Sequence, residues 1–596
     1  MSDETPRRLF RTPGLLAPIL LAVATFIMGL VGINWGLPSE ARNKLDFYDR
    51  PPEAPQISQE VMERSWEYFP EFSWWPGHQG SVENLSVRTP RWLFNPIRSY
   101  HPDEYVVLKS ISNMNPSKWD LDTKFFAWPS LFTYVVAAVL KIASILGLVT
   151  LRPSLGFYYE HPDQMARVYL VGRLVVCVFG AGTVAAVYFL GKRLLDWYGG
   201  LAAAAVMLLC PAFVVYLHEL EPDVPMLFFV TLALIACARI AEGASWRPYV
   251  VAGLFTGLAA GCKYDAAYVV LVLAIAHFIG EFQTKSWGAA LSLRSWGRLL
   301  VGLVCAALVF VVTNPYQVVH FREVWWVASH AVATVWFPLP IPAALIPWHM
   351  LTVSLGMGAL FFAVVGVFMG GRKTLFLSIA LVLLYILQAC SASQYIRHYL
   401  VLFPFIAVLS AGWIKFVVTT TATAVSPRRR AAIIGVLSVF FASVVVFPLA
   451  NVSWAFLRQF TGVNTRDAAG KWIAAHVPAG AKLALVAQPW QYTTPPLDTA
   501  RYKIVITGYD YDKLEAGRPE YLILSSADFA HPYGLSLPLR QKLEFETCVR
   551  ILGKPRKTDF ERPLNPLCRP LFVVGFTWPE DMLFTNPRVE IHRFER

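Results

Sequence analysis

The sequence predicts a polytopic α-helical membrane protein, with about eleven transmembrane helices and a C-terminal soluble α/β domain. Hydrophobic residues make up 56% of its 596 residues and charged residues only 15%, whereas a soluble globular domain carries about 25% charged residues. Long apolar stretches recur up to residue 454. After them the chain changes to short β-branched runs separated by Pro, Gly and Asp, which are typical of the strands and turns of a soluble domain.

The first apolar run, Leu15–Trp35, follows the basic residues Arg7, Arg8 and Arg11. It is too long for the apolar region of a signal peptide, and no small-residue cleavage site precedes the polar loop after it. We therefore expect a retained membrane anchor whose N-terminus lies in the cytoplasm.

Ten further apolar stretches predict transmembrane helices, several of them shorter than the roughly 20 residues that cross a bilayer. Short apolar cores are tolerated where the helix ends lie in protein or at the interface. The ten stretches are Val168–Leu190, Leu201–Leu217, Pro225–Ile240, Tyr249–Cys262, Ala266–Gly280, Leu299–Val312, Leu351–Gly370, Thr374–Cys390, Tyr399–Val417 and Ala431–Trp454.

One more apolar stretch, Ala127–Val149, is expected to lie at the outer membrane interface instead of crossing. When it is left out, the basic clusters of alternate loops all fall on the side of the N-terminal arginines, as the excess of Lys and Arg in cytoplasmic loops requires. Counted as a crossing, it would place every one of these clusters outside. Lys141 near its middle also fits a helix that does not cross alone.

This topology divides the chain at residue 455. Residues 1–455 are expected to form the transmembrane domain, with an outer loop at 38–167 that contains the interfacial helix at 127–149. Residues 456–596 are expected to form an extracytoplasmic domain. Its elements are a helix capped by Asn464 and strands at Lys482–Ala487, Tyr502–Thr507, Tyr521–Leu524 and Val589–Arg593.

Two features of composition limit the possible partners. The net charge of +12 would suit nucleic-acid binding, but no motif for it accompanies the charge, so we expect membrane lipid and no nucleic acid. Six of the 8 cysteines lie in apolar runs. The other two, Cys548 and Cys568, could form a disulfide outside the cytoplasm or remain two thiols.

The polar segment His101-Pro102-Asp103-Glu104 lies in the first outer loop. Pro102 favours a helix start, where carboxylates are stabilised in any case, so a solvated helix end is the simplest interpretation. Adjacent carboxylates on a helix point about 100° apart, so one can also face a substrate while the other caps or pairs.

Asp122 and Lys124 precede the interfacial helix, beside Phe125, Phe126 and Trp128. A lysine at this depth could hold a lipid phosphate. Alternatively, Lys124 is an interfacial anchor and the aromatic residues form the belt that many membrane proteins carry.

Further charged residues gather at the outer ends of later spans, where an ionised group is costly and needs a partner or water. Each alone is compatible with a structural role. Together they place carboxylates and cations at one depth on one face, which suits a phosphate leaving group and an acceptor that must be deprotonated. They are Glu221, Asp223, Lys263, Arg322, Arg397 and His398.

In order and sidedness these motifs resemble the GT-C superfamily of membrane glycosyltransferases, in particular the protein O-mannosyltransferases and the lipid A aminoarabinose transferases. Thr123 stands where the family often has Glu, so Asp122 is expected to take that role. The similar elements are Asp103-Glu104, Asp122-Thr123-Lys124 with the helix that follows, Arg173, Asp223, Gly257–Tyr264, and Arg397-His398-Tyr399-Leu400 with Pro404.

The resemblance implies a GT-C fold and a sugar transfer, with inversion, from a polyprenyl-phosphate donor to a hydroxyl of a protein, lipid or glycan. The transfer would occur at the outer face of a bacterial inner membrane. Asp103 would be the general base, with Glu104 and Asp223 as further acidic residues. The expected contacts to the donor phosphate are Lys124, Lys263 and Arg397, and the expected supporting residues are His101, Asp122, Glu221, His398 and Arg322.

No cofactor is expected. Some members of the superfamily use a divalent metal, and the carboxylate oxygens of Asp103 and Asp223 are of the type that binds one. The closer relatives do not require a metal for catalysis, so we expect none here.

Two other functions were weighed. A transporter or flippase of a polyprenyl-linked substrate would need polar residues near the bilayer midplane, whereas the predicted spans are nearly free of charge. A ligase or acyltransferase with His101 or His218 as base would need a nucleophile motif, and none accompanies these histidines.

Overall fold

The computed structural model describes residues 15–47, 97–153, 155–243, 245–284, 292–333, 341–369, 371–391, 395–422, 426–485, 492, 494–498, 501–507, 517–525, 548–550, 582, 587 and 589–594. The chain divides into two compact units, which we call the bundle unit and the mixed unit. The bundle unit comprises Met1–Leu30, Phe125–Tyr134 and Val175–Trp454. The mixed unit comprises Val31–Lys124, Val135–Leu174 and Ala455–Arg596.

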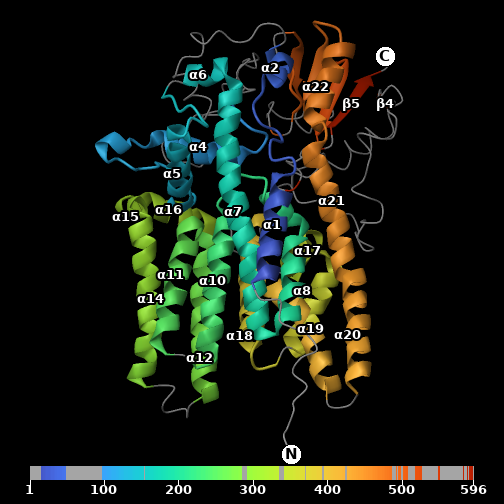
Figure 1. The fold of residues 1–596 in the computed structure, drawn as a ribbon. Coiled ribbons are helices and arrows are strands. Elements are labelled where there is room, and N and C mark those ends of the chain that lie inside the picture. The colour runs from blue at the N-terminus through green and yellow to red at the C-terminus, as the bar shows by residue number, and fades with distance from the viewer. Residues whose placement is uncertain are drawn as a thin grey trace, which may run out of the picture. The chain divides into compact units, whose positions relative to one another are not determined.

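The bundle unit is built mainly from apolar helices (Figure 1). They are α1 (Leu16–Leu30), α8 (Trp197–Leu208), α9 (Pro211–Tyr216), α10 (Asp223–Ala241), α11 (Trp246–Cys262), η6 (Tyr264–Tyr268), α12 (Val269–Thr284), α14 (Leu293–Thr313), α15 (Pro315–Val319), α16 (Phe321–Ala333), α17 (Ile341–Met369), α18 (Leu375–Ser391), η7 (Ile396–Leu402), α19 (Phe403–Ala422), α20 (Pro427–Phe441) and η8 (Ala442–Val446). Three helices, α5 (Leu131–Ile145), α7 (Pro162–Leu194) and α21 (Phe447–Thr461), have residues in both units.

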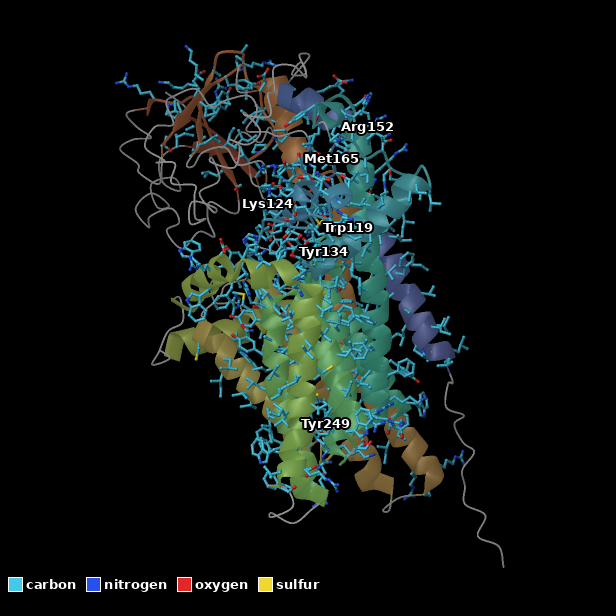
Figure 2. The ribbon with its side chains drawn as sticks, turned by 90° about the vertical axis from the view of Figure 1, so that its left-hand side faces the viewer. Trp119, Lys124, Tyr134, Arg152, Met165 and Tyr249 are labelled. Carbon is cyan, nitrogen blue, oxygen red and sulfur yellow. The ribbon has the colours of Figure 1, made fainter. Side chains whose placement is uncertain are left out.

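Small residues let neighbouring helices of the bundle unit approach closely, as is common between membrane helices. Helices α10, α11, α12 and α14 lie side by side (Figure 1). A Cβ atom added to Gly253 of α11 would lie 2.3 Å from the carbonyl oxygen of Gly302 on α14, and one added to Gly257 would lie 2.5 Å from that of Ala306. These two glycines therefore set the spacing of the α11–α14 pair. Figure 2 shows Tyr249 of α11 near the end of the bundle opposite to Tyr134.

The predicted membrane class is confirmed. Within the described ranges, each of the eleven apolar stretches predicted to cross the bilayer coincides for most of its length with one, two or three consecutive helices. Seven helical segments there are long and apolar enough to cross a membrane, and four shorter apolar helices accompany them. The basic residues before α1 lie outside the described residues.

The helix α5 (Leu131–Ile145) corresponds to the stretch expected at the interface. Its start is fixed by Asn314, whose Oδ1 accepts hydrogen bonds from the backbone N–H groups of Ser130 at 2.7 Å and Leu131 at 3.0 Å. With 15 residues and a rise of about 1.5 Å per residue, it is shorter than the roughly 30 Å of hydrocarbon in a bilayer. Its interfacial position remains a prediction.

The mixed unit combines short helices with a five-stranded sheet of order β2-β1-β3-β5-β4. Strand β1 pairs in parallel with β2 and β3, and β5 pairs antiparallel with β3 and β4. The elements are α2 (Glu40–Phe47), α4 (Pro102–Asn113), η5 (Pro116–Lys118), α6 (Leu155–Glu160), α22 (Thr465–His476), β1 (Lys482–Leu485), β2 (Lys503–Ile506), β3 (Tyr521–Ser525), β4 (Cys548–Arg550) and β5 (Val589–Phe594).

The C-terminal part is an α/β arrangement, as predicted. Ala469 and Ile473 of α22 pack on Leu483, Ile523 and Ile591 of the sheet, and all five side chains are buried. The four predicted strands and the Asn464-capped helix are confirmed to within about two residues at each end. Strand β4 was missed because its three residues carry no alternating pattern. Cys568 and the side chain of Cys548 lie outside the described residues, and the domain boundary at residue 455 remains a prediction.

Candidate active site

The predicted site residues fall into two groups, one in each unit. In the mixed unit, α4 begins at Pro102, as predicted, and carries Asp103 and Glu104 in its first turn. His101 is the N-cap residue and is 1% exposed, with its backbone N–H bonded to Ser99 Oγ at 3.3 Å. Asp103 is half-buried, whereas Glu104 is completely buried. The two adjacent carboxylates thus have different surroundings.

Glu104 forms a closed ion pair with Arg173 of α7. Arg173 Nε and Nη2 donate to the two carboxylate oxygens at 2.6 and 2.7 Å, and neither side chain is exposed. Arg173 Nη1 also donates to the backbone carbonyls of Ile33 at 2.7 Å and Trp35 at 2.8 Å. Burial by itself raises the pKa of Glu104, but the charge and hydrogen bonds of Arg173 outweigh it and hold that pKa below its ordinary value.

This pairing separates the roles of the two carboxylates. Both oxygens of Glu104 are occupied by one guanidinium, which is the strongest geometry for such a pair. Glu104 therefore ties α4 to α7 and to the segment that follows α1. Asp103 is the carboxylate of the pair whose side chain keeps some access to solvent.

Lys124 and Asp122 lie in the loop between η5 and α5. Asp122 is buried, and its Oδ1 accepts a hydrogen bond from the backbone N–H of Lys124 at 2.9 Å. The N–H of Asp122 is bonded in turn to Asp120 Oδ1 at 3.0 Å. Lys124 has a φ of 52°, which is unusual for a residue with a side chain, and it is exposed. Asp122 thus shapes the loop that presents Lys124, which is labelled in Figure 2.

In the bundle unit, Lys263 is the centre of an open cluster of charges. Its Nζ lies 2.6 Å from Asp223 Oδ1 and 3.8 Å from Asp265 Oδ2. Asp223 is the first residue of α10, and Lys263 follows the last residue of α11. Burial lowers the pKa of Lys263, but Asp223 and Asp265 outweigh this effect and raise it above its ordinary value. Lys263 is therefore a fixed cation at neutral pH.

His398 and Arg397, both of η7, complete this cluster. His398 Nδ1 lies 3.1 Å from Asp265 Oδ2. Arg397 interacts electrostatically with both Lys263 and Asp265, and its guanidinium lies 4.9 Å from the ring centroid of Tyr395. Five ionisable side chains, four of them predicted site residues and the fifth Asp265, thus come together from α10, the α11–η6 turn and η7.

The remaining predicted residues have less specific surroundings. Glu221 is buried in the turn before α10. Arg322 is exposed on α16, and the structure gives no contact that joins it to Lys263 among the described residues. Arg322 has the least support of the predicted site residues.

Two residues of these groups were not singled out from the sequence as site residues. Asp265 was passed over, although an acid two positions after Lys263 in the same turn was a usable signal. Arg173 was noted only as a similar position. Its partner Glu104 is 69 residues away in the sequence, and nothing local indicates that pairing.

Comparison with known families bears on this geometry. Residues 167–314 match the family model of the dolichyl-phosphate-mannose-protein mannosyltransferases. The predicted resemblance to the GT-C glycosyltransferases is confirmed over this stretch. The mannosyltransferase-like stretch includes Arg173, Asp223, Lys263 and Asp265, whereas Asp103 lies before it. No curated protein sequence matches the chain.

Solved structures of membrane glycosyltransferases are similar at a low level. The apo form of ArnT from Cupriavidus metallidurans is 12% identical, covers 86% of this chain and 93% of its own, and has a TM-score of 0.40. The Archaeoglobus fulgidus oligosaccharyltransferase with zinc and sulfate is 12% identical, covers 70% of this chain and 62% of its own, and has a TM-score of 0.36. This chain therefore spans about three fifths of that protein's length. The S. cerevisiae Pmt1-Pmt2 complex with its sugar donor is 15% identical, covers 48% of this chain and 36% of its own, and has a TM-score of 0.27. Scores this low carry no information on activity.

Proposed function

We propose that the protein transfers a sugar from a polyprenyl-phosphate donor to an acceptor hydroxyl, with inversion at the anomeric carbon. The observation that carries this proposal is the open cluster around Lys263, a buried cation whose pKa is raised by two carboxylates. The family model matched by residues 167–314 describes enzymes named for a lipid-phosphate sugar. The donor, the acceptor and the extracytoplasmic location of the reaction are part of the proposal.

In the proposed reaction the acceptor oxygen attacks the anomeric carbon from the face opposite the phosphate. The bond between that carbon and the phosphate oxygen breaks, and its electron pair leaves with the phosphate. Asp103 accepts the proton of the acceptor hydroxyl as the new bond forms, a role worth about 10²–10⁴-fold for a positioned base. Asp103 suits this role because its side chain is half-buried, whereas Glu104 is completely buried with both carboxylate oxygens bonded to Arg173.

The leaving phosphate needs cations rather than an acid, because it leaves already ionised. Lys263 and Arg397 supply fixed positive charge, and Lys124 supplies a third cation from its loop. Asp223 and Asp265 keep Lys263 protonated and oriented, and His398 holds Asp265. Preorganised charges of this kind act most strongly where water is excluded.

We further propose a multi-pass protein of a bacterial inner membrane, with a cytoplasmic N-terminus and residues 456–596 outside. The positive-inside distribution of Lys and Arg supports this orientation. The mechanism relies on side-chain cations at the phosphate.

The proposal can be tested with purified protein in nanodiscs and a panel of polyprenyl-phosphate sugars. We expect one donor to release polyprenyl phosphate in a reaction that depends on an acceptor. Lys263→Met should slow this release by about 10²–10³-fold, whereas Lys471→Met, at an exposed lysine of α22, should retain it. Equal activity of the two variants would refute the role of Lys263, and no release from any donor would refute the function.

A further inference from the structure

A second buried cluster lies entirely in the mixed unit, around Tyr100. Tyr100 is 3% exposed, and two guanidinium groups lie over its ring, that of Arg466 at 3.9 Å and that of Arg42 at 4.8 Å from the ring centroid. The hydroxyl of Tyr100 donates a hydrogen bond to Asp467 Oδ1. We call these four residues the Tyr100 clamp.

The clamp is anchored in the C-terminal part of the chain by the first turn of α22. Arg466 is completely buried, its Nε donates to Asn464 Oδ1 at 2.9 Å, and its Nη1 donates to the carbonyl of Tyr492 at 2.6 Å. Burial lowers the pKa of Arg466 to about 10, so the guanidinium stays charged at neutral pH. A charged and desolvated guanidinium over an aromatic ring is a favourable arrangement.

The other side of the clamp reaches the outer-loop segment before α4. Arg42 of α2 donates to the carbonyls of Gly36 at 3.2 Å and of Arg98. The N–H of Tyr100 donates to the carbonyl of Gly36 at 2.9 Å. A Cβ atom at Gly36 would lie 2.8 Å from the Cβ of Tyr100, so the two segments can pack this closely only because residue 36 is glycine.

Tyr100 is three residues before Asp103, and the intervening residues leave little freedom. His101 is buried and bonded to Ser99, and Pro102 has a fixed φ. On the other side of Asp103, Glu104 is held by Arg173. The half-buried Asp103 therefore lies in the sequence between two fixed residues. Tyr100 is held by the clamp, which includes Arg466 and Asp467 of the C-terminal part, and Glu104 is held by Arg173.

We infer that Tyr100, Arg466 and Asp467 are positioning residues for Asp103, and that the C-terminal domain thereby takes part in assembling the reaction centre. This inference rests on the proposed function, because it assigns Asp103 as the base. Removal of the Tyr100 hydroxyl breaks the hydrogen bond to Asp467 but leaves the Glu104–Arg173 pair intact, so the start of α4 is released on one side only. Misplacing a catalytic group by about 1 Å can cost about 10²-fold in rate, so a loss near tenfold is expected for this partial release.

The test uses the full-length protein and Tyr100→Phe, which keeps the aromatic ring beside the two guanidinium groups and removes the hydroxyl that donates to Asp467. Tyr502→Phe is the matched control, because it also removes a buried tyrosine hydroxyl of the same unit, one that donates to the Ile473 carbonyl at 3.3 Å. We expect Tyr100→Phe to lower kcat about tenfold, with the donor KM within about twofold of wild type. In an Asp103→Glu background, its further effect should fall below about twofold, because coupled residues are not additive.

Amide hydrogen exchange gives a second measurement that needs no turnover. Exchange in residues 101–108 should be faster in Tyr100→Phe than in wild type, and unchanged in Tyr502→Phe. Equal rates and equal exchange in the two variants, or a tenfold loss that persists in Asp103→Glu, would overturn the inference. If the wild type transfers no sugar from any donor, the proposed function fails, while the exchange experiment still decides whether the clamp orders α4.

Discussion

The Glu104–Arg173 pair and the Lys263 cluster both contain buried ion pairs, but they differ in whether their charged groups can bind a further charged group. In the first, two carboxylate oxygens face two nitrogens of one guanidinium, whose third nitrogen is bonded to two backbone carbonyls, and neither side chain is exposed. In the second, a single Nζ lies near two carboxylates, and the Lys263 side chain is 10% exposed. The Glu104–Arg173 pair is therefore suited to a structural role, whereas the Lys263 cluster is suited to binding a further charged group.

The difference has a physical basis. A buried ion pair stabilises a protein only when its remaining hydrogen-bonding groups are also satisfied, and the Glu104–Arg173 pair meets this condition. The ammonium group of Lys263 has three donors. Its neighbours Asp265 and His398 are about a quarter and a third exposed. A donor phosphate can therefore join this cluster, whereas the closed pair has no free position for it.

The largest effect is expected on breaking the closed pair. Glu104→Gln leaves the Arg173 charge buried without its partner, so the free energy of unfolding should fall by about 3–5 kcal/mol. A drop in melting temperature in detergent would measure this. Replacing both residues, as in Glu104→Leu with Arg173→Met, should restore part of the loss, and a double variant less stable than either single one would contradict a closed pair.

The second effect concerns the open cluster. Lys263→Met should lower kcat by about 10²–10³-fold, as removal of a preorganised charge does, while its melting temperature falls less than half as far as that of Glu104→Gln. Donor turnover and melting curves of the same samples would show this. A large loss of stability with little loss of rate would show instead that Lys263 is structural.

A smaller effect is expected at the edge of the open cluster. His398→Asn removes the partner of Asp265, and because both groups are partly exposed, the interaction is worth only about 0.2–1 kcal/mol. Turnover should fall by no more than about fivefold, with melting unchanged. A loss as large as that of Lys263→Met would mean that His398 acts on the substrate directly.

The smallest effect is the pH dependence of the stability that the Glu104–Arg173 pair contributes. Because the pKa of Glu104 lies below its ordinary value of 4.5, its contribution to stability is fully present above pH 4.5 and is lost as the pH falls through the lower, folded-state pKa. The difference in melting temperature between wild type and Glu104→Gln should therefore narrow on acidification below pH 4.5. A difference that widens there would contradict the direction of the shift.

The sequence was informative where a property is local. Apolar stretches predicted the helices, Pro102 predicted the start of α4, and Asn464 predicted that of α22. Lys263 and Asp223 stood out because charges at the ends of apolar helices are costly. The pairing of Glu104 with Arg173 could not be predicted, since it joins residues 69 positions apart, and neither could the clamp around Tyr100, which lies 366 positions before Arg466.

The most direct test of the account is the release of polyprenyl phosphate from a panel of polyprenyl-phosphate sugars by wild type and Asp103→Asn. The account predicts acceptor-dependent release from one donor by the wild type, and a rate at least about 10²-fold lower in Asp103→Asn, with the melting temperature unchanged. Retained turnover in Asp103→Asn would contradict the base assignment, and a wild type that consumes no donor would contradict the proposed transfer itself.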